Sequence, residues 1–330
     1  MATQFPVRHA LASSASDRKF LFVFATGGWD VTKVFATEFA NPNIDFEPGA
    51  QLGVVGNLSF VDHGDRSATR RFFERFYEKT LIVNGVQVPS VAHDSCRRLM
   101  MTGTTNDGSS DWPALLAAKH AEIYPLPHLV LDGPAYPGQF GQVVTRTGTS
   151  GQLDALLNGS ILEWSDTPVG VSDYRAEEIV DRYLRQRTSA ELVGAEAQRK
   201  SMLEGFEVSL SRAGQLKAYQ HDLNWEGGGF SEQTALAIDA LERGLTRCIT
   251  LDYSEDSWDT HSKGEPVQSS NFQGLFLALE SMLDALAVTP GSSGPLSEET
   301  VVVVLSEMGR TPQLNAKDGR DHWPYTSAML

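Results

Sequence analysis

The sequence predicts an α/β fold in which helices cover both faces of a largely parallel sheet. Three short apolar runs, at residues 20–25, 246–252 and 301–305, are rich in β-branched or aromatic residues, as is typical of strands buried on both faces. Alanine, leucine and phenylalanine recur at helical spacing in residues 231–244 and 271–287, which predicts helices there. This pattern favours a packed, largely parallel sheet with helical layers.

The composition limits the classes of protein to which the chain can belong. Its 330 residues, of which 41% are hydrophobic, suffice for one large α/β domain or two small ones. We interpret them as a tail of residues 1–19 and one domain of residues 20–330. The formal net charge of −15 argues against a nucleic-acid partner, because little would neutralise phosphates. Cys96 and Cys248 are far apart and indicate neither a disulfide scaffold nor a cysteine-rich zinc site.

The sequence contains no apolar stretch long enough to span a membrane. Residues 1–19 are polar and rich in serine and alanine, so they lack the apolar region of a secretory signal. We therefore expect a cytoplasmic protein, or an exported one whose signal lies outside this sequence.

Local patterns predict the remaining elements. In the first half we expect an amphipathic helix at 67–79, a hairpin at 81–88 that turns at Asn84-Gly85, a helix that follows His93, a helix at 112–120 that begins after Asp111, and a strand at 128–131. Residues 173–223 are charged and poor in glycine, which predicts an insertion of two or three helices. We expect this insertion to lie over or beside the strand ends and to shape substrate access; the alternative is a lobe remote from them.

Acidic and imidazole groups follow the predicted strands, and the carboxyl ends of parallel strands meet at one edge of a sheet. Asp259 and His261 are two residues apart, so in an extended segment they point to the same side. Carboxylate and imidazole together suit zinc, manganese or iron better than calcium. We predict one divalent-metal pocket made of Asp30, Asp259, His261, Glu307, Asp321 and His322. For Asp30 the alternative is a cap on a helix at residues 31–39.

The start of the helix that follows His93 contains candidate nucleophiles or bases: His93, Asp94, Ser95 and Cys96. A helix N-terminus favours anions and lowers the pKa of a thiol or hydroxyl group. The alternative is an ordinary capped helix that buries Leu99, Met100 and Met101 in the core.

The motifs WDTH at 258–261, SEMGRTP at 306–312 and GRDHW at 319–323, together with GGWD at 27–30, resemble the domain-of-unknown-function 1501 family. That family is similar in fold to the alkaline phosphatase and sulfatase superfamily, and the resemblance covers about residue 20 to the end. It implies an alkaline-phosphatase-like fold with metal ligands at Asp30, at Asp259 with His261, and at Glu307. Where the superfamily has Asp-His, this sequence has Glu307-Met308, so Asp321-His322 is expected to supply an imidazole.

The same resemblance implies the catalytic candidates. Sulfatases carry a Cys or Ser nucleophile in C/S-x-P-S-R, ahead of Leu-Thr-Gly. Aligned on Thr102-Gly103, the motif Arg falls on Arg97, its Ser on Cys96 and the nucleophile position on His93. The sequence therefore lacks the usual sulfatase nucleophile, and we take His93, Cys96, Arg97 and Arg310 as the catalytic candidates.

These observations predict a metal-dependent hydrolase of a small anionic phosphate or sulfate ester. The divalent ion would polarise the ester oxygen and activate the attacking group, while Arg310 and Arg97 would neutralise the nonbridging oxygens. The first alternative is a metal-binding protein without hydrolase activity that serves as a ligand or partner platform. The second is a structural α/β module in which the acids cap helices.

The end of the sequence supports one more expectation. Members of the resembled family continue past Leu330 with glycine-rich sequence, so we expect a chain that lacks the last strand or helix. An exposed sheet edge would then favour association.

Overall fold

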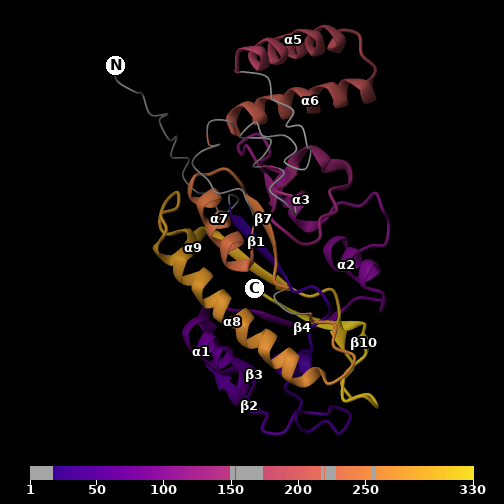
Figure 1. Cartoon of the computed structure of the whole chain (residues 1–330), viewed down its shortest axis with the longest axis vertical. Helices are drawn as coiled ribbons and strands as arrows, with labels where there is room; N and C mark the ends of the chain where they lie inside the picture. The colour runs from indigo at the N-terminus through magenta and orange to yellow at the C-terminus, as the bar shows by residue number, and fades with distance from the viewer. Residues whose placement is uncertain (1–17, 149–152, 154–173, 217–218, 220–227, 255–256) are drawn as a thin grey trace, which may run out of the picture.

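The computed structural model describes residues 18–148, 153, 174–216, 219, 228–254 and 257–330 (Figure 1). Its centre is a seven-stranded sheet with the order β4-β11-β8-β1-β7-β5-β6. The strands are β1 (Lys19–Phe24), β4 (Ile82–Gln87), β5 (His128–Val130), β6 (Val144–Arg146), β7 (Cys248–Asp252), β8 (Thr300–Leu305) and β11 (Tyr325–Met329).

The prediction of a largely parallel sheet is confirmed. β8, β1, β7, β5 and β6 run parallel to one another, whereas β11 is antiparallel to both β8 and β4. β1 lies between β7 and β8 in the middle of the sheet. The loops that follow these three strands therefore emerge side by side at the carboxyl edge.

Helices cover both faces of the sheet. The described helices are α1 (Ser67–Phe76), α2 (His93–Thr102), α3 (Trp112–Ala118), α5 (Tyr174–Leu192), α6 (Ala197–Leu216), α7 (Phe230–Glu242), α8 (Gly264–Val288) and α9 (Leu296–Glu299). Leu21 and Val23 of β1 belong to the large core cluster that includes side chains of α1, α7 and α8. Phe22 and Phe24, on the other face, pack in a cluster with Met101 of α2 and with α3. Side chains of β1 alternate between the two helical layers, as the pleat of a strand requires.

Short elements complete the described chain. They are the hairpin of β2 (Gln51–Val55) and β3 (Leu58–Asp62), the ribbon of β9 (Gly309–Arg310) and β10 (His322–Trp323), and the 3-10 turns η1 (Val31–Lys33), η2 (Gly64–Arg66), η3 (Tyr77–Lys79) and η4 (Gly138–Val143). None of the helices within the described residues combines the length and the apolar character needed to cross a membrane.

The hairpin predicted at residues 81–88 is wrong, because these residues form the single strand β4. Gly85 has a φ of +73°, so the Asn-Gly pair correctly indicated a left-handed residue. In the structure that residue makes a bulge: Thr326 of β11 pairs with Val86, but Ser327 pairs with Asn84. A β-bulge uses the same glycine conformation as a tight turn, and local sequence does not distinguish them.

The predicted helical insertion is present as α5 and α6, which pack against each other at one end of the molecule (Figure 1); residues 173, 217–218 and 220–223 lie outside the described part. Arg212 of α6 donates hydrogen bonds to the carbonyls of Gln142 and Ala121. These carbonyls belong to the segments that lead into β6 and β5, at the amino edge of the sheet. The expected position beside the carboxyl strand ends is therefore wrong, and the alternative of a remote lobe is confirmed.

Candidate metal centre

Two buried tryptophans hold the loops that follow β1 and β7 beside each other. Trp29 and Trp258 are fully buried, with their ring centroids 6.5 Å apart in an edge-to-face arrangement. The indole of Trp29 donates to Thr326 Oγ1 (2.8 Å), and that of Trp258 donates to the carbonyl of Tyr253 (3.0 Å). Buried tryptophans satisfied in this way act as rigid anchors, so the residue after Trp258, Asp259, is delivered to the carboxyl edge.

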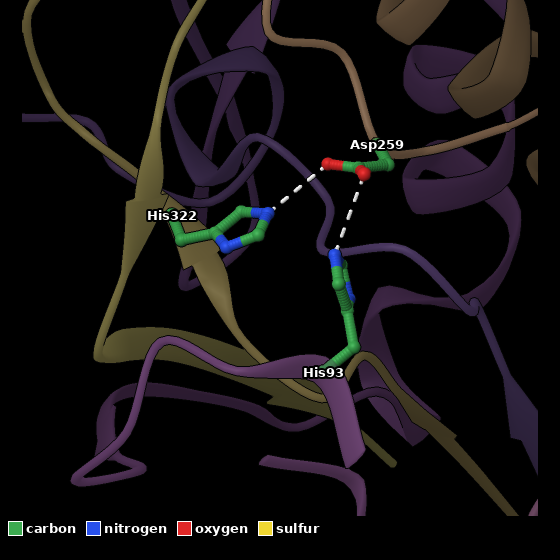
Figure 2. Close-up of side chains that lie close together, drawn as sticks. All are labelled: His93, Asp259 and His322. Carbon is green, nitrogen blue, oxygen red and sulfur yellow. Dashed lines mark hydrogen bonds and ion pairs between the residues drawn. The ribbon is translucent and has the colours of Figure 1, made fainter. Parts of the chain in front are cut away.

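Asp259 is the centre of the site. Its Oδ1 accepts from Arg310 Nη2 at 2.7 Å and lies 3.0 Å from His261 Nε2 and 3.1 Å from His322 Nε2. Its Oδ2 lies 3.4 Å from His93 Nε2, and Figure 2 shows His93 and His322 pointing at this carboxylate from separate elements. Burial alone would raise the pKa of Asp259, but hydrogen bonds from Arg310 and His322 and the nearby cationic charge hold it well below its usual range.

The three imidazoles share one orientation: Nδ1 faces an acceptor and Nε2 faces Asp259. The Nδ1 contacts are His93 with Glu307 Oε1 at 2.9 Å, His261 with Asp321 Oδ1 at 3.0 Å, and His322 with the carbonyl of Val91 at 2.7 Å. Ionised carboxylates and carbonyls only accept hydrogen bonds, so Nδ1 carries the hydrogen in each ring. Where Nε2 also carries a hydrogen, the ring donates it to the Asp259 carboxylate; where it does not, Nε2 presents a lone pair, the arrangement typical of metal-bound histidine.

These lone pairs lack donors. His261 Nε2 and His322 Nε2 are 3.0 Å apart, and His93 Nε2 is buried without a hydrogen-bond partner. Lone pairs held this close need a cation between or beside them, either a proton or a metal ion. His93, Asp259 and His322 each offer one ligand atom, and these three atoms lie within 4.8 Å of one another. His261 also contacts Asp259. The donor set therefore fits a divalent transition metal.

Glu307 contacts the His93 ring nitrogen that faces away from Asp259. Its carboxylate is fully buried and accepts the Gly27 amide on both oxygens, at 2.9 and 3.0 Å. The hydrogen bond to Glu307 is the main reason that the pKa of His93 is raised above its ordinary value, and burial opposes the shift. Asp321 supports His261 in the same way, and the hydrogen bond from His261 lowers the pKa of Asp321. Glu307 and Asp321, both predicted as metal ligands, therefore contact histidines of the centre rather than Asp259.

Arg310 is also a supporting residue. Its side chain is fully buried, and its nitrogens donate to the carbonyls of Gly27, Gly28 and Arg320 as well as to Asp259. The guanidinium expected to face substrate oxygens is thus occupied by protein acceptors. Gly28 lets it approach, because a Cβ there would lie 2.8 Å from Met308 Cγ and 3.3 Å from Arg310 Nη2.

Asp30 lies apart from the other predicted ligands. Its Oδ1 accepts from the amide (3.0 Å) and hydroxyl (2.7 Å) of Thr32, and its Oδ2 pairs with Arg320 Nε at 2.8 Å. The carboxylate caps the single turn η1, which corresponds to the alternative stated for it; the longer helix expected at 31–39 is absent from this described stretch.

The catalytic candidates on α2 differ in how far their side chains are buried. Cys96 is fully buried in a cluster with Val88 and Met308, and burial raises the pKa of its thiol, so it is poorly suited to nucleophilic attack. Arg97 is partly exposed, and its guanidinium pairs with the exposed carboxylate of Asp94. His93, expected as a nucleophile, instead directs Nε2 at Asp259. The sequence indicated His93 as a nucleophile candidate at a helix start, and the structure instead makes it a fourth member of the centre.

Comparison with known proteins agrees with part of the sequence interpretation. The model of a family described as "Protein of unknown function (DUF1501)" matches residues 172–330. This range contains Asp259, His261, Glu307 and His322 but not His93, and it supports the DUF1501 family. Comparison with curated proteins finds no match, and comparison with solved structures finds none either.

Proposed function

We propose that this protein is a metal-dependent hydrolase of phosphate or sulfate esters, built on a fold related to that of alkaline phosphatases and sulfatases. The proposal rests on one observation: the Nε2 atoms of three histidines surround the Asp259 carboxylate, while each Nδ1 is held by an acceptor. Such pre-oriented imidazoles resemble metal ligands with their supporting partners.

His93, His261, His322 and Asp259 would hold the ion, and their mixed nitrogen and oxygen donors suit zinc, manganese or iron. A divalent ion supplies Lewis acidity to the ester and lowers the pKa of water toward neutrality. Glu307 and Asp321 keep the ring nitrogens of His93 and His261 in the required orientation. Cys96 is buried, and in this proposal water is the attacking group.

Arg97 is the residue that we assign to the nonbridging oxygens of the ester. It follows His93 by four residues on α2, so both side chains extend from the same face of the helix. Its charge is balanced by an exposed partner, Asp94, whose side chain is 96% accessible; an anionic ester can displace such a partner at little cost. Arg310 is engaged by the protein and would position Asp259 instead.

A second candidate function is metal binding without catalysis, as a ligand or partner platform. The observation that favours it is that the nucleophile position of the resembled sulfatase motif falls on His93, whose Nε2 faces Asp259. Both functions require the same ion, and turnover distinguishes them.

The test measures metal content and turnover together. Protein purified without chelator is analysed for zinc, manganese and iron, then assayed with p-nitrophenyl phosphate and p-nitrophenyl sulfate. We expect bound metal and turnover in the natural sequence, and at least about tenfold lower metal retention in Asp259→Asn. Asp65→Asn is the matched control, because Asp65 is an exposed acid 3.7 Å from a histidine nitrogen outside the centre.

Three results separate the alternatives. Metal with turnover that both disappear in Asp259→Asn supports the hydrolase. Metal without turnover on either ester supports the platform. Failure of the natural sequence to bind any of the three metals would contradict both proposals.

A further inference from the structure

His261 lies where two loops cross, and the crossing is held by the main chain. We call it the His261 crossing: residues 259–264 meet residues 315–320. Lys263 N donates to the carbonyl of Lys317 (3.0 Å), Gly264 N to that of Asp318 (3.1 Å), and Arg320 N to that of Thr260 (3.3 Å). Loops some 50 residues apart in sequence therefore behave as one unit at this point.

The side chain of Asn315 connects both loops to the imidazole. Its Nδ2 donates to the carbonyl of His261 (3.0 Å) and to Asp321 Oδ1 (3.1 Å), the same oxygen that His261 Nδ1 contacts. Its Oδ1 accepts from the amides of Lys317 (2.9 Å) and Gly319 (3.1 Å). One amide group thus fixes the main chain of His261 and the partner of its ring.

Gly319 supplies a second, independent contact. A Cβ at this position would overlap the carbonyl carbon and oxygen of His261 and the amide of Ser262. The φ of Gly319 lies outside the left-handed region, so glycine is not needed here for backbone conformation. The need is for close approach of the two loops, which any side chain would push apart.

The crossing also holds residues in an unusual conformation. Among the described residues, the non-glycine positions with positive φ are Lys263 (48°) and Asp318 (55°), and both belong to the crossing. L-residues adopt this region rarely and keep it where surrounding contacts impose it. Their location indicates that the crossing is tightly constrained.

We propose that Asn315 and Gly319 are positioning residues that hold His261 with Nδ1 on Asp321 and Nε2 on Asp259. The consequence for metal affinity rests on the metal centre proposed above, but the orientation of the ring does not. His261 is an exposed member of the centre, with a side-chain accessibility of 45%, so it depends on the crossing rather than on core packing for its position.

The experiment compares Asn315→Ala and Gly319→Ala with two matched controls. Asn106→Ala removes an exposed amide whose Oδ1 accepts only a local turn contact, from Gly108 N. Gly141→Ala adds a Cβ where nothing lies within 4 Å and φ is not left-handed. Circular dichroism of all four variants checks that the fold is retained.

The first readout needs no metal. Long-range proton–nitrogen NMR at alkaline pH reports which nitrogen of His261 carries hydrogen, with the signal assigned from its loss in His261→Gln. We expect the Nδ1–H form in the natural sequence and both controls, because the Asp259 oxygen that faces Nε2 already accepts from Arg310 whereas Asp321 accepts at Nδ1. We expect a mixture of tautomers in Asn315→Ala and Gly319→Ala, where the contact with Asp321 is loosened.

The second readout is zinc affinity, measured by competition with a chromophoric chelator. We expect about tenfold weaker binding in Asn315→Ala and Gly319→Ala and unchanged binding in the controls. An unchanged tautomer in both variants would overturn the positioning role. If the natural sequence binds no zinc, the proposed metal centre fails, while the tautomer result still decides the roles of Asn315 and Gly319.

Discussion

Each histidine of the candidate centre has a partner that can only accept a hydrogen bond. Glu307 serves His93, Asp321 serves His261, and a main-chain carbonyl serves His322. Such partners place the hydrogen on Nδ1 and increase the basicity of Nε2. In the proposed metal centre these acids would act on the ion indirectly, through an imidazole, and removing them would weaken metal binding although the histidine itself remains.

Arg97→Met tests the residue assigned to the ester oxygens. Methionine keeps much of the apolar stem but removes the charge, so we expect kcat/KM for p-nitrophenyl esters to fall about a hundredfold with metal content unchanged. The adjacent Arg98 packs over the ring of Tyr136 at 4.7 Å and pairs with Asp107, which makes Arg98→Met the matched control. Equal loss in both variants would contradict a specific role for Arg97.

At the scale of elements, α3 shows how a helix cap can carry an electrostatic cost. Asp111 accepts from Ala114 N at 2.8 Å as the N-cap of α3, and its other oxygen accepts from Tyr136 N. The side chain is fully buried. Burial raises the pKa of Asp111 to about 6 from an ordinary value of 3.8, although both hydrogen bonds oppose the shift.

This shift predicts a pH dependence of stability. Because the folded state binds the proton more tightly than the unfolded state, the contribution of Asp111 is favourable below about pH 4 and is lost as pH rises through about 6. The effect is on the order of 3 kcal/mol at most. Asp111→Asn has no titrating group, so its free energy of unfolding should improve relative to the natural sequence between these pH values.

Urea unfolding at a series of pH values measures this difference. In Asp111→Asn the asparagine amide would face the Tyr136 amide, so we also expect the free energy of unfolding to be lower by the same amount at every pH. A constant decrease does not change the shape of the pH profile, which is what is compared. Asp107→Asn, at a side chain that is 92% exposed, is the control. Parallel pH profiles for Asp111→Asn and the natural sequence would rule out the proposed shift.

At the scale of the whole molecule, the sheet separates two regions. The candidate centre lies at the carboxyl edge, where β1, β7 and β8 end, near β10 (Figure 1). α5 and α6 attach through Arg212 to carbonyls at the amino edge. This arrangement leaves the helical pair without a direct role in holding the proposed metal ion.

Arg212→Ala tests that separation. Loss of its two hydrogen bonds should speed amide hydrogen exchange in α5 and α6, because the pair is then less firmly held to the domain. Zinc affinity should stay within about twofold of the natural value, since distant sites act independently. Arg199→Ala is the control, as Arg199 contacts Glu191 within the helical pair. A large change in zinc affinity would contradict the separation.

The sequence by itself determined the parts of this protein that depend on local chemistry. Apolar runs located β1, β7 and β8 because strands buried on both faces need such runs. Asp111 located the start of α3 because an N-cap needs a short acceptor. The strand-end rule also brought Asp259 and His261 to the carboxyl edge, since both follow β7 by a few residues.

Only the tertiary structure decided which of the predicted residues face Asp259 and which acids instead accept a hydrogen bond from a histidine of the centre. Glu307 and Asp30 both follow core strands, yet one holds His93 and the other pairs with Arg320. Which partner each acid meets is set by how the loops pack around Trp29 and its neighbours. The sequence indicated His93 as a site residue at a helix start, but only the packing of α2 against the sheet brings its Nε2 to Asp259, and no spacing in the sequence encodes a contact of that kind.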